Sequence, residues 1–148
     1  MPQELNSASL TQALRDWFRG CPYLQSGAKV GADYLPDRPT EYAVYATPSA
    51  IRTRENVLGE EIPLDEQTQN FIFASKEPYG ADIRQNLLNQ AFYEAVMGWI
   101  WEKNAKRQLP AIQGGTVKSI VPTLTALIAE AGSDTAKYQI QIKMTYRR

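Results

Sequence analysis

KYQIQIKMTYRR, residues 137–148, alternates apolar and polar side chains without interruption from Tyr138 to Tyr146. Because successive side chains of a strand point to opposite faces of a sheet, this period predicts a half-buried strand. The face expected to be buried comprises Tyr138, Ile140, Ile142, Met144 and Tyr146. The other face comprises Gln139, Gln141, Lys143 and Thr145. A face of this composition is either exposed to solvent or covered by a polar partner.

The segment from Asp82 to about Arg107 predicts a long helix that covers this strand. Asp82 and Gln85 stand at capping-box spacing, and Pro110 follows the segment. Apolar residues recur every three or four positions, which predicts one broad face packed on a sheet. This face comprises Ile83, Leu87, Leu88, Ala91, Phe92, Ala95, Val96, Trp99 and Ile100. Trp101 points toward the rim of the core, where it either anchors an interface or packs against a loop.

Shorter elements complete the fold. Residues 9–19 have apolar side chains at helical spacing and predict a short amphipathic helix. Further strands are predicted at residues 42–47, 68–75 and 116–130, with turns and a short extended piece between residues 20 and 41. Pro122 lacks a backbone donor and predicts an edge position or a bulge.

These elements predict a single α+β domain spanning residues 1–148. Its antiparallel-rich, mixed sheet of about four strands has the short N-terminal helix and the long helix packed on one face. The Ile83–Ile100 face of the long helix is expected to lie against a sheet that includes the last strand of the chain.

Residues 51–67, IRTRENVLGEEIPLDEQ, interrupt this pattern with a polar and mainly acidic segment. Gly59 lies near its middle and predicts a turn. A segment of this length without a buried face predicts a long polar loop or an exposed hairpin. It serves either as a functional surface or as a solvated connector.

Charge and composition limit the possible partners. Sixteen basic residues balance sixteen acidic residues, with no basic run, so sequence-specific nucleic-acid binding is not expected. No apolar run is long enough for a membrane span, and MPQELNSASL lacks the features of a signal peptide. The single cysteine, Cys21, fits a reducing compartment, so assembly in a cytoplasm is expected.

The sequence predicts no catalytic, cofactor-binding or metal-binding residues. Histidine is absent, which removes the commonest general base and the His-dependent triads. With one cysteine, a zinc site would depend mostly on carboxylates, which is unusual for zinc. No GxxxxGK, GxGxxG or GxSxG motif occurs, and Gly114-Gly115 predicts a turn.

Some isolated reactive side chains still need an interpretation. Cys21 is expected to be an inert thiol, and the carboxylate pairs Asp33 with Asp37 and Glu60 with Glu61 are expected to be loop charges. The enzymatic alternative is carboxylate or lysine chemistry, for which the candidate lysines are Lys29, Lys76 and Lys118. A ligand-binding module on the uncovered face of the sheet is a further alternative.

Four stretches carry a resemblance to a known family. They are LRDWFRGCPYL (14–24), LPDRPTEYAVYATP (35–48), ASKEPYGADIRQNLLNQAFYEAVMGWI (74–100) and AKYQIQIKMTYRR (136–148). From about Leu14 to Arg148 the chain resembles the minor capsid or tail-terminator-like proteins of tailed phages and prophages of Gram-positive bacteria. The resemblance lies in these stretches of sequence and not in a catalytic motif. Residues 51–67 carry the least of it, as expected of a variable loop.

The resemblance implies an α+β subunit of a homo-oligomeric ring, commonly a hexamer, in the tail or neck of a virion. Such a ring caps the tail tube and joins it to the head, so the implied partners are further copies, the tail tube protein and the head-side connector or neck protein. No catalytic or cofactor residue carries over. A neck, head-completion or minor capsid protein is the nearest alternative.

A ring requires a heterologous interface, in which two different patches of one subunit meet. The acidic segment 51–66 and the basic tail 137–148 are candidates for these patches, and solvated surface is the alternative for both. The candidate interface residues are Arg52, Arg54, Glu60, Glu61, Asp65, Glu66, Trp101, Lys143, Arg147 and Arg148.

Overall fold

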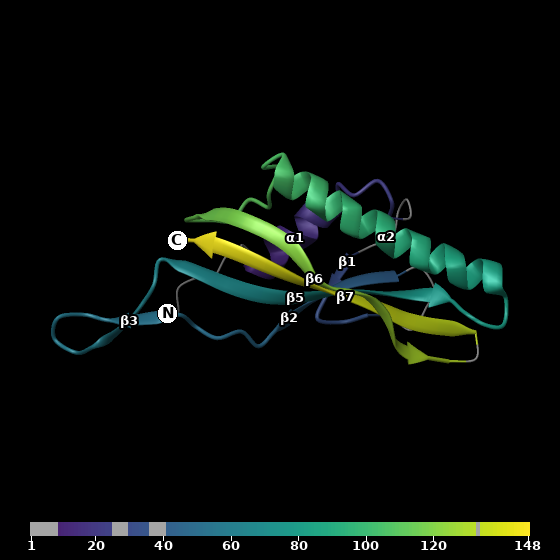
Figure 1. Ribbon diagram of the computed structural model, residues 1–148, viewed down its shortest axis with the longest axis horizontal. Coiled ribbons are helices and arrows are strands. Elements are labelled where there is room, and N and C mark those ends of the chain that lie inside the picture. The colour runs from purple at the N-terminus through teal and green to yellow at the C-terminus, as the bar shows by residue number, and fades with distance from the viewer. Residues whose placement is uncertain (1–8, 25–29, 36–40, 133) are drawn as a thin grey trace, which may run out of the picture.

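The computed structural model describes residues 9–24, 30–35, 41–132 and 134–148. Figure 1 shows a twisted sheet with both described helices on one side of it. The elements are α1 (Leu10–Phe18), β1 (Val30–Ala32), β2 (Glu41–Thr47), β3 (Thr53–Glu55), β4 (Glu61–Pro63), β5 (Glu66–Pro78), α2 (Ile83–Ala105), β6 (Thr116–Ala131) and β7 (Thr135–Arg147).

The predicted α+β class is confirmed, but the predicted number of strands is too low. The described residues contain a five-stranded sheet of order β1-β2-β5-β7-β6 and a separate two-stranded sheet, β3-β4. β1 pairs with β2 in parallel and the other pairs are antiparallel, so the sheet is mixed. β1, β3 and β4 have three residues each, too few to show a period of two in the sequence.

The predicted strand at the C-terminus is β7, and its inward face is the predicted one. Tyr138, Ile140, Ile142 and Met144 are buried, whereas Tyr146 is half-buried at the strand's end. β7 lies between β5 and β6, so ladders on both sides satisfy its backbone. The prediction for Pro122 is also confirmed, because β6 is an edge strand whose register shifts between Pro122 and Leu124.

α1 closes one end of the core. The Ser9 hydroxyl accepts a hydrogen bond from the Gln12 backbone N–H at 3.1 Å, which caps the helix. Leu14 and Phe18 are fully buried. The Phe18 ring stacks on that of Phe73, with a centroid distance of 4.6 Å, which joins α1 to the central strand β5.

α2 begins where predicted, but its N-terminal half buries a different face. Asp82 caps it by accepting a hydrogen bond from the Arg84 N–H at 3.0 Å. Val96, Trp99 and Ile100 are buried as predicted. In the N-terminal half the buried side chains are instead Asn89 and Tyr93. Ile83, Leu87, Leu88 and Ala91 are exposed, so the prediction of one continuous apolar face from Ile83 to Ile100 is wrong.

Hydrogen-bond partners on the sheet explain why the N-terminal half of α2 buries a different face from the predicted one. The Asn89 amide donates to the Pro78 carbonyl at 2.7 Å, and the Tyr93 hydroxyl donates to the Tyr138 carbonyl at 3.1 Å. Tyr93 also shares a hydrogen bond with Ser75. Asn89 and Tyr93 can be buried at these positions because the sheet supplies their hydrogen-bond partners, and burial without partners would cost about 1–3 kcal/mol for each side chain. The apolar period of the helix carries no information about these groups.

Candidate interaction site

The segment predicted as a loop or an exposed hairpin is a hairpin. β3 and β4 pair with Arg54 opposite Ile62 and Glu55 opposite Glu61. Figure 1 shows this hairpin projecting beyond the end of the main sheet. It therefore lies outside the core, where its side chains are accessible to a partner.

Asn56 shapes the tip of the hairpin. Its side-chain oxygen accepts hydrogen bonds from the backbone N–H groups of Leu58 and Glu60, at 2.9 and 3.0 Å. Gly59 has a φ of 79°, a conformation that glycine adopts without strain. This turn directs Val57 and Leu58 into solvent: Val57 is fully exposed and Leu58 is 77% exposed.

Gln67 ties the base of the hairpin to β5. Its side-chain amide accepts from the Arg52 N–H at 2.9 Å and donates to the carbonyls of Arg52 and Leu64, both at 2.8 Å. The Leu64 N–H donates to the Arg52 carbonyl at 2.9 Å. These bonds hold the two ends of the hairpin together. The sequence pattern does not reveal this role of Gln67, because its partners are backbone groups fifteen and three residues away.

The acidic segment and the basic tail, predicted as two separate patches, meet within one chain. Glu66 is the register partner of Arg147, and the Arg148 N–H donates to the Asp65 carbonyl at 3.2 Å. The Glu66 carboxylate pairs with Lys118 at 3.1 Å and with Arg52 at 3.5 Å. The hydrogen bond from Lys118 and its charge lower the pKa of Glu66. Glu66 and Arg52 thus already have partners in the single subunit.

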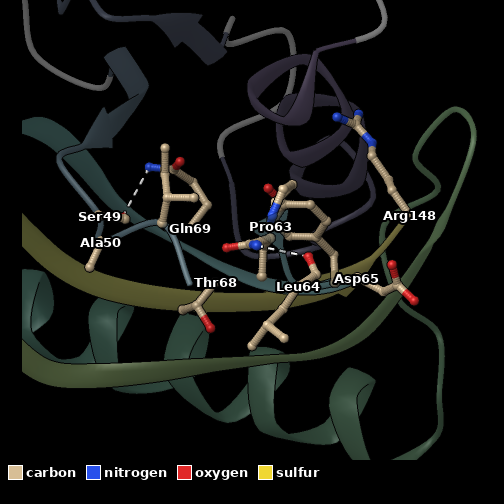
Figure 2. Close-up of a pocket in the computed structure, with 11 residues that line it drawn as sticks. Ser49, Ala50, Pro63, Leu64, Asp65, Thr68, Gln69 and Arg148 are labelled. Carbon is tan, nitrogen blue, oxygen red and sulfur yellow. Dashed lines mark hydrogen bonds between the residues drawn. The ribbon is translucent and has the colours of Figure 1, made fainter. Parts of the chain in front are cut away.

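A pocket of about 400 Å³ opens at the hairpin base (Figure 2). Its lining combines polar groups such as Ser49 and Gln69 with the apolar surfaces of Leu64 and Tyr146. The guanidinium of Arg148 lies 5.7 Å from the centre of the Tyr146 ring. Asp65 and Arg148, both exposed, also line the pocket (Figure 2). The pocket could hold an apolar side chain with a polar or charged neighbour.

The remaining predicted interface residues do not form one cluster. Arg54, Glu60 and Glu61 are exposed on the hairpin, and Arg147 is exposed at the end of β7. Trp101 is 52% exposed on α2, in the layer of helices. Lys143 is exposed on β7 and faces the opposite side of the sheet. The structure therefore brings together only the hairpin base and the C-terminal tail.

The face of the sheet opposite the helices forms a second accessible surface. Register places Tyr45, Ile72, Gln141 and Leu124 in one row across β2, β5, β7 and β6. Tyr45 and Ile72 are half-buried, and Leu124 is 49% exposed. β7 adds Lys143 and Lys137, whose ammonium lies 5.1 Å from the centre of the Tyr45 ring. Of this face, the sequence pattern predicts only the polar residues of β7.

A buried polar cluster under α2 comes closest to a catalytic arrangement. It comprises Ser75, Glu77, Asn89, Tyr93 and Tyr138. Burial raises the pKa of Glu77, partly offset by a hydrogen bond from Ser75, and burial raises the pKa of Tyr93. Asn89 contacts the Tyr138 hydroxyl at 3.4 Å. These hydrogen bonds join α2 to β5 and β7, so the cluster has a structural role.

The other reactive side chains singled out above are dispersed. Cys21 is buried, and desolvation raises the pKa of its thiol. Lys118 is paired with Glu66, and Lys76 is the cross-strand neighbour of Glu41. Lys29 and Asp37 lie outside the described residues. Among the residues that the structure describes, no three acidic, Cys or His side chains are grouped so as to hold a metal ion.

Comparisons with known proteins assign no family to this chain. No family model matches the sequence, and no curated protein matches it. Neither of the helices in the described ranges combines the length and hydrophobicity needed to cross a bilayer. The features that bear on function are therefore the accessible surfaces and the resemblance of the four sequence stretches.

Proposed function

We propose that this protein is a non-enzymatic structural subunit in the tail or neck of a tailed phage or prophage-derived particle. In this proposal, copies of the chain form a ring that terminates the tail tube and provides a surface for head attachment. The resemblance of residues 14–24, 35–48, 74–100 and 136–148 to tail-terminator-like proteins suggests this role. The mixed α+β fold is compatible with the subunit that the resemblance implies.

The observation that carries the proposal is the exposed hairpin. An isolated subunit gains nothing from holding Val57 and Leu58 in water at the end of a hairpin that projects from the domain, and this placement fits a contact with a partner. Gln67 and Asn56 nevertheless hold the hairpin in a defined shape. A shaped, projecting apolar tip fits a protein that works by assembly.

The proposed mechanism is closure of the tube. A ring bound to the last layer of tube protein covers the surface on which the next layer would stack. Its other side is then available to the connector or neck protein. Since neither step breaks a covalent bond, the function needs complementary surfaces and no catalytic group.

Electron microscopy of particles assembled with and without the protein tests this proposal. Loss of a terminator is expected to give tails of unregulated length that lack heads. Loss of a neck or head-completion protein would instead give tails of normal length beside unattached heads. Particles that remain complete without the protein would contradict both roles.

A further inference from the structure

The hairpin tip carries an unfavourable charge arrangement together with its apolar residues. Glu55 and Glu61 are direct cross-strand partners, and Glu60 is adjacent in sequence. Like charges directly opposite one another destabilise a strand pair. All three carboxylates are exposed. The hairpin tip, defined as residues 55–61, is thus an acidic rim around Val57 and Leu58 that a cationic apolar surface would stabilise.

The open face of the sheet offers that chemistry. We define the open face as Tyr45, Ile72, Leu124, Lys137 and Lys143. Its three apolar members lie in one row on β2, β5 and β6, with Gln141 at the β7 position of the row, and the two lysines flank this row on β7. No described helix lies on this side of the sheet (Figure 1).

The hairpin tip and the open face do not meet within one subunit. The two-stranded sheet is separate from the main sheet, and the hairpin extends away from its end (Figure 1). Two complementary surfaces that cannot meet within one chain can meet between chains. A contact between two different patches is heterologous and generates a ring when its rotation closes.

We infer that the hairpin tip of one copy docks on the open face of a neighbouring copy. Val57 and Leu58 pack on Tyr45, Ile72 and Leu124. The carboxylates of Glu60 and Glu61 lie near the ammonium groups of Lys137 and Lys143. This inference rests on the proposed ring and specifies its subunit interface.

A mixing experiment with the full-length chain tests this contact. One double variant, Val57→Ser with Leu58→Ser, removes the apolar side chains of the hairpin tip and leaves the open face unchanged. A second double variant, Lys137→Glu with Lys143→Glu, reverses the charges of the open face and leaves the hairpin tip unchanged. In sedimentation velocity over a range of protein concentrations, the wild type is expected to form oligomers, and each variant alone is expected to associate roughly tenfold or more weakly. An equimolar mixture should form dimers only, because it retains a single intact interface per pair.

Leu87→Ser with Leu88→Ser is the matched control. It removes two exposed leucines from α2, away from both proposed surfaces, and should leave wild-type association unchanged. A charge exchange that adds Glu60→Lys and Glu61→Lys to the second variant should restore association. Restoration would show that the variants had folded and that the charges act as a pair.

Three results would overturn the inference. These are a wild type that remains monomeric, a mixture that forms no dimers, or a control variant that dissociates while the tip variant does not. The outcome is separable from that of the particle experiment. Oligomers that depend on the tip, combined with normal particles in the protein's absence, would support the interface and reject the phage role. Unregulated tails in the protein's absence, combined with a monomeric wild type, would support the phage role and reject the interface.

Discussion

The two faces of the main sheet come from the same strands, yet they bury very different fractions of their side chains. On the helix-covered face, Phe71, Phe73 and Ile140 are fully buried. On the open face, their neighbours Ile72 and Gln141 are only half-buried. Burial of apolar surface is the main favourable contribution to folding, so the covered face determines stability. The open face can change with little effect on folding, which leaves its chemistry available for recognition.

The largest expected effect is that of Phe73→Ala on the covered face. The Phe73 ring contacts those of Phe18, Tyr42 and Tyr93, so its removal leaves a cavity among aromatic side chains. We expect a loss of about 3–5 kcal/mol in the free energy of unfolding, measured by urea denaturation. Ile72→Ala, the next residue on the opposite face, should cost roughly 1 kcal/mol on the monomer. Equal losses would contradict the contrast between the faces.

Tyr93→Phe is expected to cost about 1–2 kcal/mol. This change removes only the hydroxyl, which bonds to Ser75 and to the Tyr138 carbonyl beneath α2. Tyr23→Phe is the control, because Tyr23 is exposed and its hydroxyl can bond to water. If both variants unfolded at the wild-type urea concentration, the buried polar cluster would contribute nothing to the orientation of α2.

Glu77→Gln should change the pH dependence of stability. Because burial raises the pKa of Glu77 in the folded state, the unfolded chain loses this proton first as the pH rises. Its contribution to stability is therefore fully present below the ordinary carboxyl pKa and is lost as the pH rises through the folded pKa. The variant should match the wild type in acid and exceed it near neutral pH, in urea unfolding at several pH values. A difference that is constant with pH would refute this assignment.

Lys143→Glu is expected to have the smallest effect on folding. Lys143 is exposed on the open face, and exposed substitutions of this kind usually change stability by less than about 0.5 kcal/mol. Urea unfolding at concentrations where the chain is monomeric measures this effect. A loss of more than about 1 kcal/mol would mean that the open face contributes to the core.

The candidate site was predictable only in part. The acidic composition and Gly59 of residues 51–67 were sufficient to predict an exposed segment, and the structure shows a hairpin there. Its closure by Gln67 was not predictable, because a glutamine that binds backbone carbonyls leaves no periodic signal. The row formed by Tyr45, Ile72 and Leu124 was also not predictable from the sequence, since it arises from the register of strands far apart in the chain.

Local sequence patterns were enough to predict α1, β2 and β7, which have strong periods, and the extent of α2, which Asp82 and Pro110 delimit. Alternation and helical spacing act between near neighbours, so they can be read along the chain. Only tertiary packing set which side of α2 faces the sheet, because Asn89 and Tyr93 are buried where carbonyls of β5 and β7 accept their hydrogen bonds. It also decided that the acidic segment and the basic tail lie side by side, since strand pairing joins Glu66 to Arg147 across most of the chain.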